Sequence, residues 1–175
     1  TVAENPFKSF INKITFGLFF NEDIDVTLEA TDAGSGVVEL CYLRSEMALT
    51  EDELLESDKW VAYTGKITET ARDAEQFIYY AKAVDAAGNV ALVSSNGVVF
   101  DLTAPAFSGV TPNGVYYTTQ QVTVRDANLD TVTLNGEPVG ETVTLPGDVE
   151  ASYTLEATDK VGNTATITVT MQPID

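Results

Sequence analysis

Carboxylates are the side chains of this sequence with the greatest capacity for chemistry. The 175 residues include 27 aspartates and glutamates against 9 lysines and arginines, a formal net charge of −18. Four aspartates, Asp32, Asp85, Asp101 and Asp126, fall near a predicted strand end or linker, where gathered oxygens could bind Ca²⁺ at a domain junction. The simpler interpretation is that each aspartate caps its own turn by accepting hydrogen bonds from backbone amides. We favour the capping interpretation and predict neither a metal nor another cofactor.

The remaining reactive groups argue against an enzyme. The sequence contains no histidine, which excludes histidine-based acid–base catalysis, the common nucleophilic triads and histidine metal sites. Cys41 lies in an apolar run and is predicted to be a small buried hydrophobe. As the single cysteine it cannot form an intrachain disulfide. A carboxylate pair can hydrolyse glycosides, but the acidic residues here are scattered over predicted turns and polar faces. We therefore predict no catalytic residues.

Aromatic side chains offer a second kind of chemistry, the stacking of sugar rings. The candidates are Trp60, Tyr63, Tyr116 and Tyr117. Isolated aromatics in a sheet protein more often pack in the core or at its rim. Carbohydrate binding therefore stays an alternative to the packing interpretation.

A self-formed lysine–asparagine isopeptide bond is a third possibility, and it requires a buried lysine. Lys82 alternates with the apolar positions of its predicted strand. We therefore expect its side chain to point into solvent, which argues against this crosslink.

The charge of the chain excludes some partners. A surface this acidic repels phosphate backbones and anionic lipids, so we predict no nucleic-acid binding and no docking on such membranes. The apolar run 14–20 is far shorter than the roughly 18 residues of a membrane-spanning helix, so we predict no membrane insertion.

Two segments repeat one pattern 74 residues apart, from Tyr79 to Asn89 and from Tyr153 to Asn163. Both read Tyr-x-apolar-x-Ala-x-Asp-x-x-Gly-Asn. Alternation places the Tyr, the apolar residue and the Ala on one face of a strand. The Asp then accepts hydrogen bonds from amides two or three residues on, and Gly-Asn tolerates positive φ. We predict a hairpin in each copy, with structural turn residues Tyr79, Asp85, Gly88 and Asn89, and Tyr153, Asp159, Gly162 and Asn163.

The repeat divides the chain into two domains, 1–104 and 105–175. Pro105 cannot donate to a sheet and biases Ala104 toward extended geometry, so 101–105 is predicted to be a short linker that does not allow free tumbling. Strands are predicted at 15–20, 24–31, 37–44, 60–64, 77–85, 90–95 and 97–101, then at 115–118, 121–126, 131–134, 142–145, 150–159 and 164–171. Asn135-Gly136 is a strong two-residue hairpin signal.

Two short helices are predicted in the first domain. Asn5 and Pro6 are a good start for one helix, with an apolar stripe from Phe7 to Ile14. Thr50 and Glu53 are typical of a capping box that opens a second helix ending near 58. With little other helix and strands every 8–12 residues, the fold class is an all-β sandwich repeated in tandem.

The sequence resembles the bacterial immunoglobulin-like domains repeated in Gram-positive, Clostridia-type cell-surface proteins. The resemblance covers nearly the whole chain and is carried by the segments 14–20, 30–37, 83–89, 101–105, 114–117 and 132–136. It implies two tandem immunoglobulin-like β-sandwiches, secretion and a stalk or adhesive context without catalysis. It transfers no binding residues, because the family has none fixed at these positions.

The function that follows is a non-catalytic structural or adhesive module of a bacterial cell-surface or secreted protein, acting as a spacer or interaction domain. The alternative is a carbohydrate-binding accessory module. We expect an extracellular or cell-surface location, a monomer, and ends that are boundaries inside a longer chain. The expected partners are the neighbouring domains of that chain, with a host or cell-wall protein or a glycan as further candidates.

Overall fold

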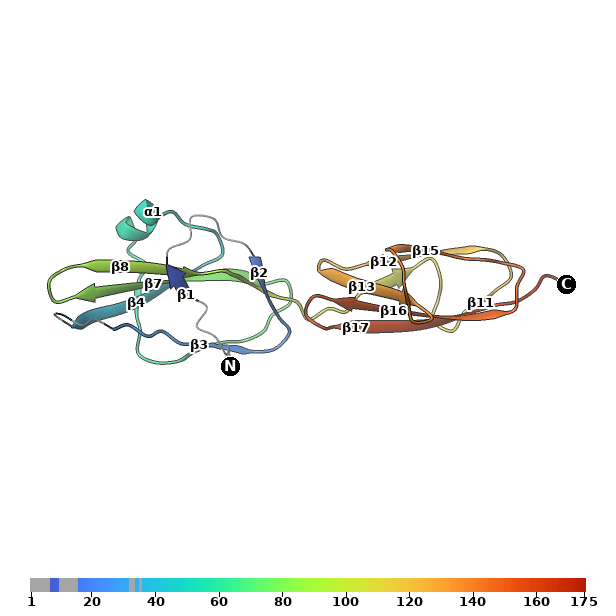
Figure 1. Ribbon diagram of the computed structural model, residues 1–175, viewed down its shortest axis with the longest axis horizontal. Coiled ribbons are helices and arrows are strands. Elements are labelled where there is room, and N and C mark those ends of the chain that lie inside the picture. Colours follow the sequence, from blue (N-terminus) through green and yellow to red (C-terminus); the bar gives the residue numbers. More distant parts are fainter. Residues whose placement is uncertain (1–6, 10–15, 32–33, 35) are drawn as a thin grey trace. The chain divides into compact units, whose positions relative to one another are not determined.

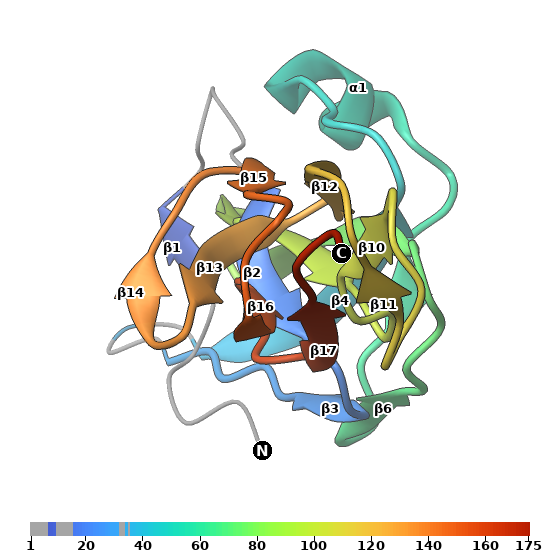
Figure 2. The ribbon, with the colours of Figure 1, turned by 90° about the vertical axis from the view of Figure 1, so that its right-hand side faces the viewer.

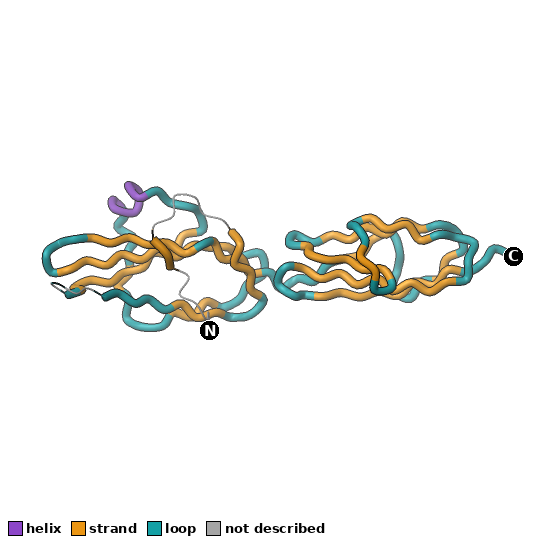
Figure 3. The backbone as a smooth tube through the Cα atoms, viewed as in Figure 1, coloured by secondary structure: helices purple, strands orange, loops and turns teal. Residues whose placement is uncertain are grey.

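The chain forms two separate structural units, each built almost entirely of β-strands (Figures 1 and 3). The structure is a computed structural model that describes residues 7–9, 16–31, 34 and 36–175. Unit 1 comprises Thr1–Asp101 and unit 2 comprises Leu102–Asp175. The division lies three residues before the boundary expected from Pro105. No helix among the described residues has the length and hydropathy needed to cross a membrane.

Unit 1 contains a large sheet and a small one. Its elements are β1 (Phe7–Ser9), β2 (Phe16–Phe20), β3 (Ile24–Val26), β4 (Val37–Ser45), α1 (Glu51–Glu56), β5 (Val61–Ala62), β6 (Ile67–Glu69), β7 (Gln76–Asp85), β8 (Val90–Ser95) and β9 (Gly97–Phe100). The large sheet has the order β1-β8-β7-β4-β5, with β9 pairing both β7 and β2. Strands β3 and β6 form the small sheet.

Both faces of the large sheet in unit 1 are covered. On one face Ile24 and Val26 of β3 pack against Phe77, Tyr79 and Phe100. On the opposite face Leu54 of α1 packs with residues of β4 and β7. Figure 1 shows α1 and β3 on opposite sides of β7, and Figure 2 shows α1 and the β3–β6 pair on opposite sides of β4. The connection from β4 to β5 therefore acts as a third layer over the sheet.

One of the two predicted helices is present. The prediction of the other is wrong for residues 7–9, the part of it that the structure describes. Helix α1 begins after Thr50, whose side chain accepts from the Glu53 amide while the Glu53 carboxylate accepts from the Thr50 amide. This is the predicted capping box. Residues 7–9, predicted to be helical, instead form β1 and pair antiparallel with β8. Pairing with a distant strand overrides the local helical pattern there, and residues 10–15 lie outside the described residues.

Unit 2 is a two-layer sandwich around one core. Its strands are β10 (Ala106–Ser108), β11 (Val115–Tyr116), β12 (Gln120–Arg125), β13 (Leu129–Leu134), β14 (Glu137–Pro138), β15 (Thr142–Leu145), β16 (Ala151–Asp159) and β17 (Thr164–Met171). The sheets have the orders β10-β12-β15 and β11-β17-β16-β13-β14. Val122 and Leu145 from the first sheet pack against Leu155 and Met171 from the second. Asn135 and Gly136, at φ 48° and 86°, make the predicted turn between β13 and β14.

The strand predictions fail mainly at short elements. Strands β6, β10 and β14, of two or three residues each, were not predicted. The predicted strand 24–31 is paired only over Ile24–Val26. Beyond it, residues 27–31 keep an alternation of exposed and less exposed positions without a strand partner among the described residues.

Candidate functional sites

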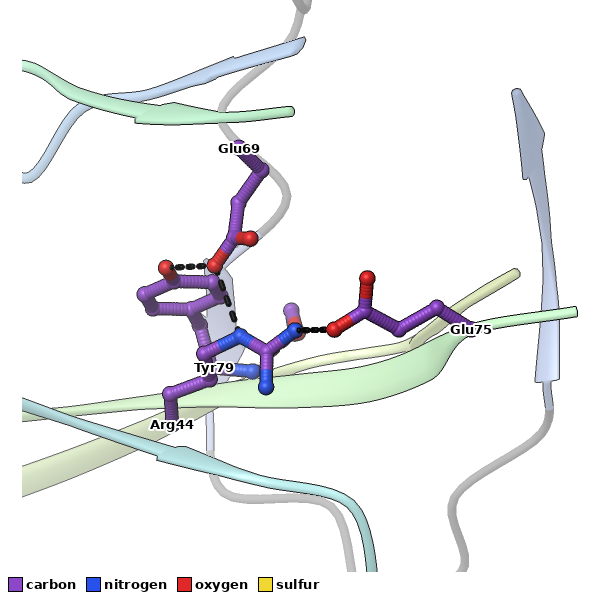
Figure 4. A network of polar contacts seen from close by, with 5 residues as sticks. Arg44, Glu69, Glu75 and Tyr79 are labelled. Atoms are coloured by element: carbon purple, nitrogen blue, oxygen red, sulfur yellow. Dashed lines mark hydrogen bonds and ion pairs between the residues drawn. The ribbon is translucent and has the colours of Figure 1, made fainter. Parts of the chain in front are cut away.

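A network of charged side chains in unit 1 is centred on Arg44. Strand β4 carries Arg44 on the same face as Tyr42, opposite Tyr79 of β7. Its Nε donates to Glu69 Oε1 at 2.7 Å and an Nη to Glu75 Oε1 at 2.7 Å. The Tyr79 hydroxyl donates to the same Glu69 oxygen (Figure 4). The network joins β4, β7, the end of β6 and the loop before β7.

The surroundings of this network favour the protonated forms of Tyr79 and Arg44. Burial and the Glu69 carboxylate raise the pKa of the Tyr79 phenol above its ordinary value. Burial alone would lower the pKa of Arg44, but the hydrogen bonds to Glu69 and Glu75 raise it on balance. The guanidinium also lies 4.2 Å from the centroid of the Phe77 ring. Both carboxylates are ion-paired to one arginine, so the arrangement suits cross-bracing of strands rather than acid–base exchange.

The sequence contains one indication of this network, the position of Arg44 within its strand. Arg44 occupies a position of β4 that alternation assigns to the inner face. A charge on an inner face requires a partner. The partners, however, lie 25 and 31 residues further along the chain in short or irregular segments.

The two repeated turns have nearly the same hydrogen bonds. Asp85 Oδ1 accepts from the amides of Ala87 and Asn89, at 2.9 and 2.8 Å. In both turns the Asn side chain donates to the second oxygen of the Asp, at 2.7 Å for Asn89 and 2.8 Å for Asn163. Asp159 differs in that its Oδ1 accepts from three amides, those of Val161, Gly162 and Asn163.

Glycine has a specific role in both turns. Gly88 and Gly162 have φ of 87° and 99°, in the left-handed region that favours glycine. The repeated tyrosines lie on the inner faces of their strands: Tyr79 is 2% exposed, and Tyr153 packs half-buried against the core of unit 2.

The aspartates considered for calcium do not act together in unit 1. Asp85 ends β7, whereas Asp101 follows β9, whose Val99 pairs with Gln76 at the beginning of β7. Nine residues of extended strand separate these ends, a distance of roughly 30 Å, so Asp85 and Asp101 do not lie at one site. Asp32 lies outside the described residues.

The Asp126 carboxylate of unit 2 serves its own turn. It accepts from the Asn128 amide at 2.7 Å, as the capping interpretation requires. Oxygens of Asp126 and Asp159 lie within 4.8 Å of each other.

Trp60 and Tyr63 do not form an open sugar platform in unit 1. Trp60 Nε1 donates to the Leu54 carbonyl at 2.9 Å, and Lys82 Nζ lies 5.0 Å from the Trp60 ring centroid. Tyr63 is half-buried. Trp60 is therefore used in packing α1 against the sheet.

The two tyrosines of unit 2 that were considered for sugar stacking, Tyr116 and Tyr117, differ from each other. The Tyr116 hydroxyl accepts from the Thr111 amide at 2.8 Å, which fixes the ring against a loop. Tyr117 is 51% exposed. A single open ring is a weak basis for carbohydrate binding.

The expectation that the Lys82 side chain points into solvent is wrong. Its side chain is 21% exposed, with Nζ 3.4 Å from Glu39 Oε1, because the segment that carries Trp60 covers this face of the sheet.

The Cys41 thiol donates to Glu39 Oε1 at 3.2 Å, and burial raises the pKa of the thiol. Cys41 is 6% exposed, as predicted for a small buried hydrophobe.

Comparison with known proteins adds evidence on the fold. No family model and no curated protein matches the chain. The N-terminal four Ig domains of Dscam1 isoform 4.44 match with a TM-score of 0.50 and 12% identity, over 96% of this chain and 45% of that chain. The fold of the chain is an all-β, immunoglobulin-like sandwich fold. The chain spans just under half of the Dscam1 structure.

Two bacterial structures are similar at lower scores. The fibronectin(III)-like modules of Clostridium thermocellum CbhA match with a TM-score of 0.39 and 12% identity, over 95% of this chain and 94% of that chain. Bacteroides ovatus SGBP-B, solved with a mixed-linkage heptasaccharide, gives 0.35 and 16%, over 96% of this chain and 46% of that chain.

Proposed function

We propose that the chain is a pair of non-catalytic spacer domains that carry tension in an extracellular bacterial surface protein. The observation that supports this role most strongly is a shared strand arrangement. In each unit the last strand pairs in parallel with a strand from the beginning of the same unit. These pairs are β2 with β9 in unit 1 and β11 with β17 in unit 2.

In unit 1 the parallel pair lies close to the exit of the chain. Phe16 of β2 is opposite Gly97 and Phe20 is opposite Phe100 at the end of β9. The pairing continues one residue further, because the Asp101 amide donates to the Phe20 carbonyl at 3.0 Å. Strand β9 also pairs with β7, so the exit strand is held on both sides.

In unit 2 the parallel pair is short but is extended by flanking bonds. The amides of Thr170 and Gln172 donate to the carbonyls of Gly114 and Tyr116, both at 2.9 Å. The Asn113 amide donates to the Thr168 carbonyl at 2.8 Å. The segment 113–116 is thus bonded along the C-terminal half of β17.

Parallel pairing determines how a pull on the chain loads these bonds. A force that draws the two ends of a unit apart pulls the early strand backward and the last strand forward. The strands must slide past each other, so all the bonds between them are loaded together. An antiparallel hairpin pulled at its open end would instead lose its bonds one at a time. A domain that spaces others on a surface benefits from the first arrangement.

Other features agree with this role without deciding it. The large negative charge favours solubility and disfavours nonspecific association. The most highly bonded carboxylates, Glu69, Asp85 and Asp159, brace strands or cap turns. Carbohydrate binding remains the alternative function, but the packing of Trp60 and the contacts of Tyr116 do not favour it.

The proposal is tested by removing one bond of the parallel pair in unit 2. Gln172→Pro deletes the amide that donates to Tyr116, and Gln172→Ala keeps it. One hydrogen bond contributes about 1 kcal/mol, so Gln172→Pro should raise the unfolding rate of unit 2 under constant load about fivefold. Gln172→Ala should leave that rate unchanged. Single-molecule force spectroscopy on the chain held at its two ends measures both. Equal rates for the two variants would show that the parallel pair does not bear the load.

A further inference from the structure

The segment 27–31 of unit 1 is a strand edge without a hydrogen-bonded partner among the residues that the structure describes. It continues β3, and its residues alternate: Leu28 is 6% exposed and Ala30 is half-buried, whereas Thr27, Glu29 and Thr31 are exposed. This is the alternation of a strand with one face on a core. Within the described part of the chain, no backbone hydrogen bond involves these five residues.

The missing partner has a local cause. Strand β6 pairs with β3 from Ile67, opposite Val26, to Glu69, opposite Ile24. A longer β6 would run through Gly65 opposite the continuation of β3. Gly65 has φ of 145°, a conformation that L-residues rarely adopt, and it takes the chain away from the strand direction. Strand β6 therefore does not pair with the continuation of β3.

An apolar pocket lies directly beneath this edge. It has a volume of about 250 Å³ and is lined by Leu28 and Ala30 from the edge and by Leu40, Ala81, Ala83 and Ala91 from the large sheet. The three alanines of the large sheet leave space that larger side chains would fill. An apolar cavity of about 150 Å³ accepts a benzene-sized molecule, so this pocket can accept an aliphatic side chain.

The charges near the pocket favour a basic partner. Glu29 lines the pocket and is exposed, and the chain carries a net charge of −18. A strand added to this edge places alternate side chains toward the pocket and toward solvent. Those directed inward must be aliphatic, and those beside Glu29 are favoured when positive.

We propose that segment 27–31 is a docking edge for an extended peptide segment of another protein, in which aliphatic side chains alternate with lysine or arginine. The incoming strand pairs with the backbone of 27–31 and places its aliphatic side chains in the alanine-lined pocket. This interaction goes beyond the spacer role and does not depend on it.

Hydrogen exchange tests the edge, and a synthetic peptide tests the partner. In the free chain the amides of 27–31 should exchange rapidly. The probe is a capped seven-residue peptide of alternating lysine and valine, Lys-Val-Lys-Val-Lys-Val-Lys. At saturation this peptide should slow exchange at 27–31 and leave the repeated turn at 159–163 unchanged. Protection of 27–31 in the free chain would overturn the proposal, because the edge would already be occupied.

Three control peptides separate strand addition from simple charge attraction. One has the same composition with the valines grouped together, one is methylated at alternate backbone nitrogens, and one has glutamate in place of lysine. Calorimetry should show at least tenfold weaker binding for each. Equal binding of the methylated or grouped peptide would overturn strand addition, and equal binding of the acidic peptide would overturn the charge preference.

Filling the pocket tests the side-chain contact. Ala83→Leu should weaken binding of the alternating peptide at least tenfold, whereas Ala86→Leu, on the exposed turn after β7, should not. Ala91→Leu, at the exposed rim of the pocket, replaces Ala83→Leu if that variant does not fold. Full binding by the filled variant would overturn the proposal. A dimer of the free chain in analytical ultracentrifugation that is lost in the filled variant would identify a second copy as the occupant, and would overturn it too.

Discussion

The repeated turns at Asp85 and Asp159 have the same local design in different surroundings. In each, the Asp accepts from following amides and from the side chain of the Asn four residues on. Asp159 is 2% exposed, whereas Asp85 is half-buried. Local sequence therefore determines the bonds of the turn, and the surroundings determine how much the structure depends on them.

Removing each aspartate should have a much larger effect in unit 2 than in unit 1. Asp159→Ala leaves three backbone amides and the Asn163 side chain without their acceptor in a buried place. It should destabilise unit 2 by about 3 kcal/mol or more. Asp85→Ala should cost unit 1 about 1 kcal/mol, because water can replace the lost acceptor at a partly exposed turn.

Calorimetry and Trp60 fluorescence together distinguish these two variants. Trp60 is the single tryptophan of the chain and lies in unit 1, so its fluorescence in urea reports on that unit. Asp85→Ala should shift the fluorescence midpoint, and Asp159→Ala should shift only the other calorimetric transition. Equal losses of stability for the two variants would show that burial does not decide the cost.

A second difference between the units is the Arg44 network, which unit 1 has in addition to its cores. Arg44→Met leaves the carboxylates of Glu69 and Glu75 without their cation. Since the Arg44 side chain is 27% exposed, we expect unit 1 to lose about 2 kcal/mol, below the 3–5 kcal/mol typical of fully buried pairs. The control is Lys66→Met, which breaks the ion pair to Asp25 at a lysine 60% exposed and should cost less than about 1 kcal/mol. Equal losses of stability for Arg44→Met and Lys66→Met in urea unfolding would show that the Arg44 network contributes no more than an exposed ion pair.

Sequence reasoning succeeded where the determinants lie within a few residues of each other. The Thr50–Glu53 capping box, the Asn135-Gly136 hairpin and the two repeated turns are of this kind. In each, either a side chain bonds to a backbone group at most four residues away, or a glycine adopts the positive φ that the turn requires.

Sequence reasoning failed where the pairing or burial of a segment depends on residues far away in the chain. Residues 7–9 carry a helical pattern but pair with β8, more than 80 residues later. Lys82 follows the alternation that predicts solvent exposure, yet the segment carrying Trp60 covers it. The alternation of 27–31 is correct for a strand, but its pairing depends on where β6 turns away. None of these outcomes is encoded near the residue concerned.

The last expected effect is a pH dependence of the stability of unit 1. The pKa of Tyr79 is raised in the folded chain, so its contribution to stability is fully present below the unfolded pKa, about 10. That contribution is lost as the pH rises toward the folded value, because the unfolded state gives up its proton first. Between pH 10 and 11 the loss should approach about 1 kcal/mol. Urea unfolding followed by Trp60 fluorescence from pH 9 to 11 measures it. Tyr79→Phe should reduce the slope relative to the unchanged chain, and the part that remains comes from Cys41 and Tyr80, whose pKa values are also raised in unit 1. An unchanged slope would show that Tyr79 does not contribute.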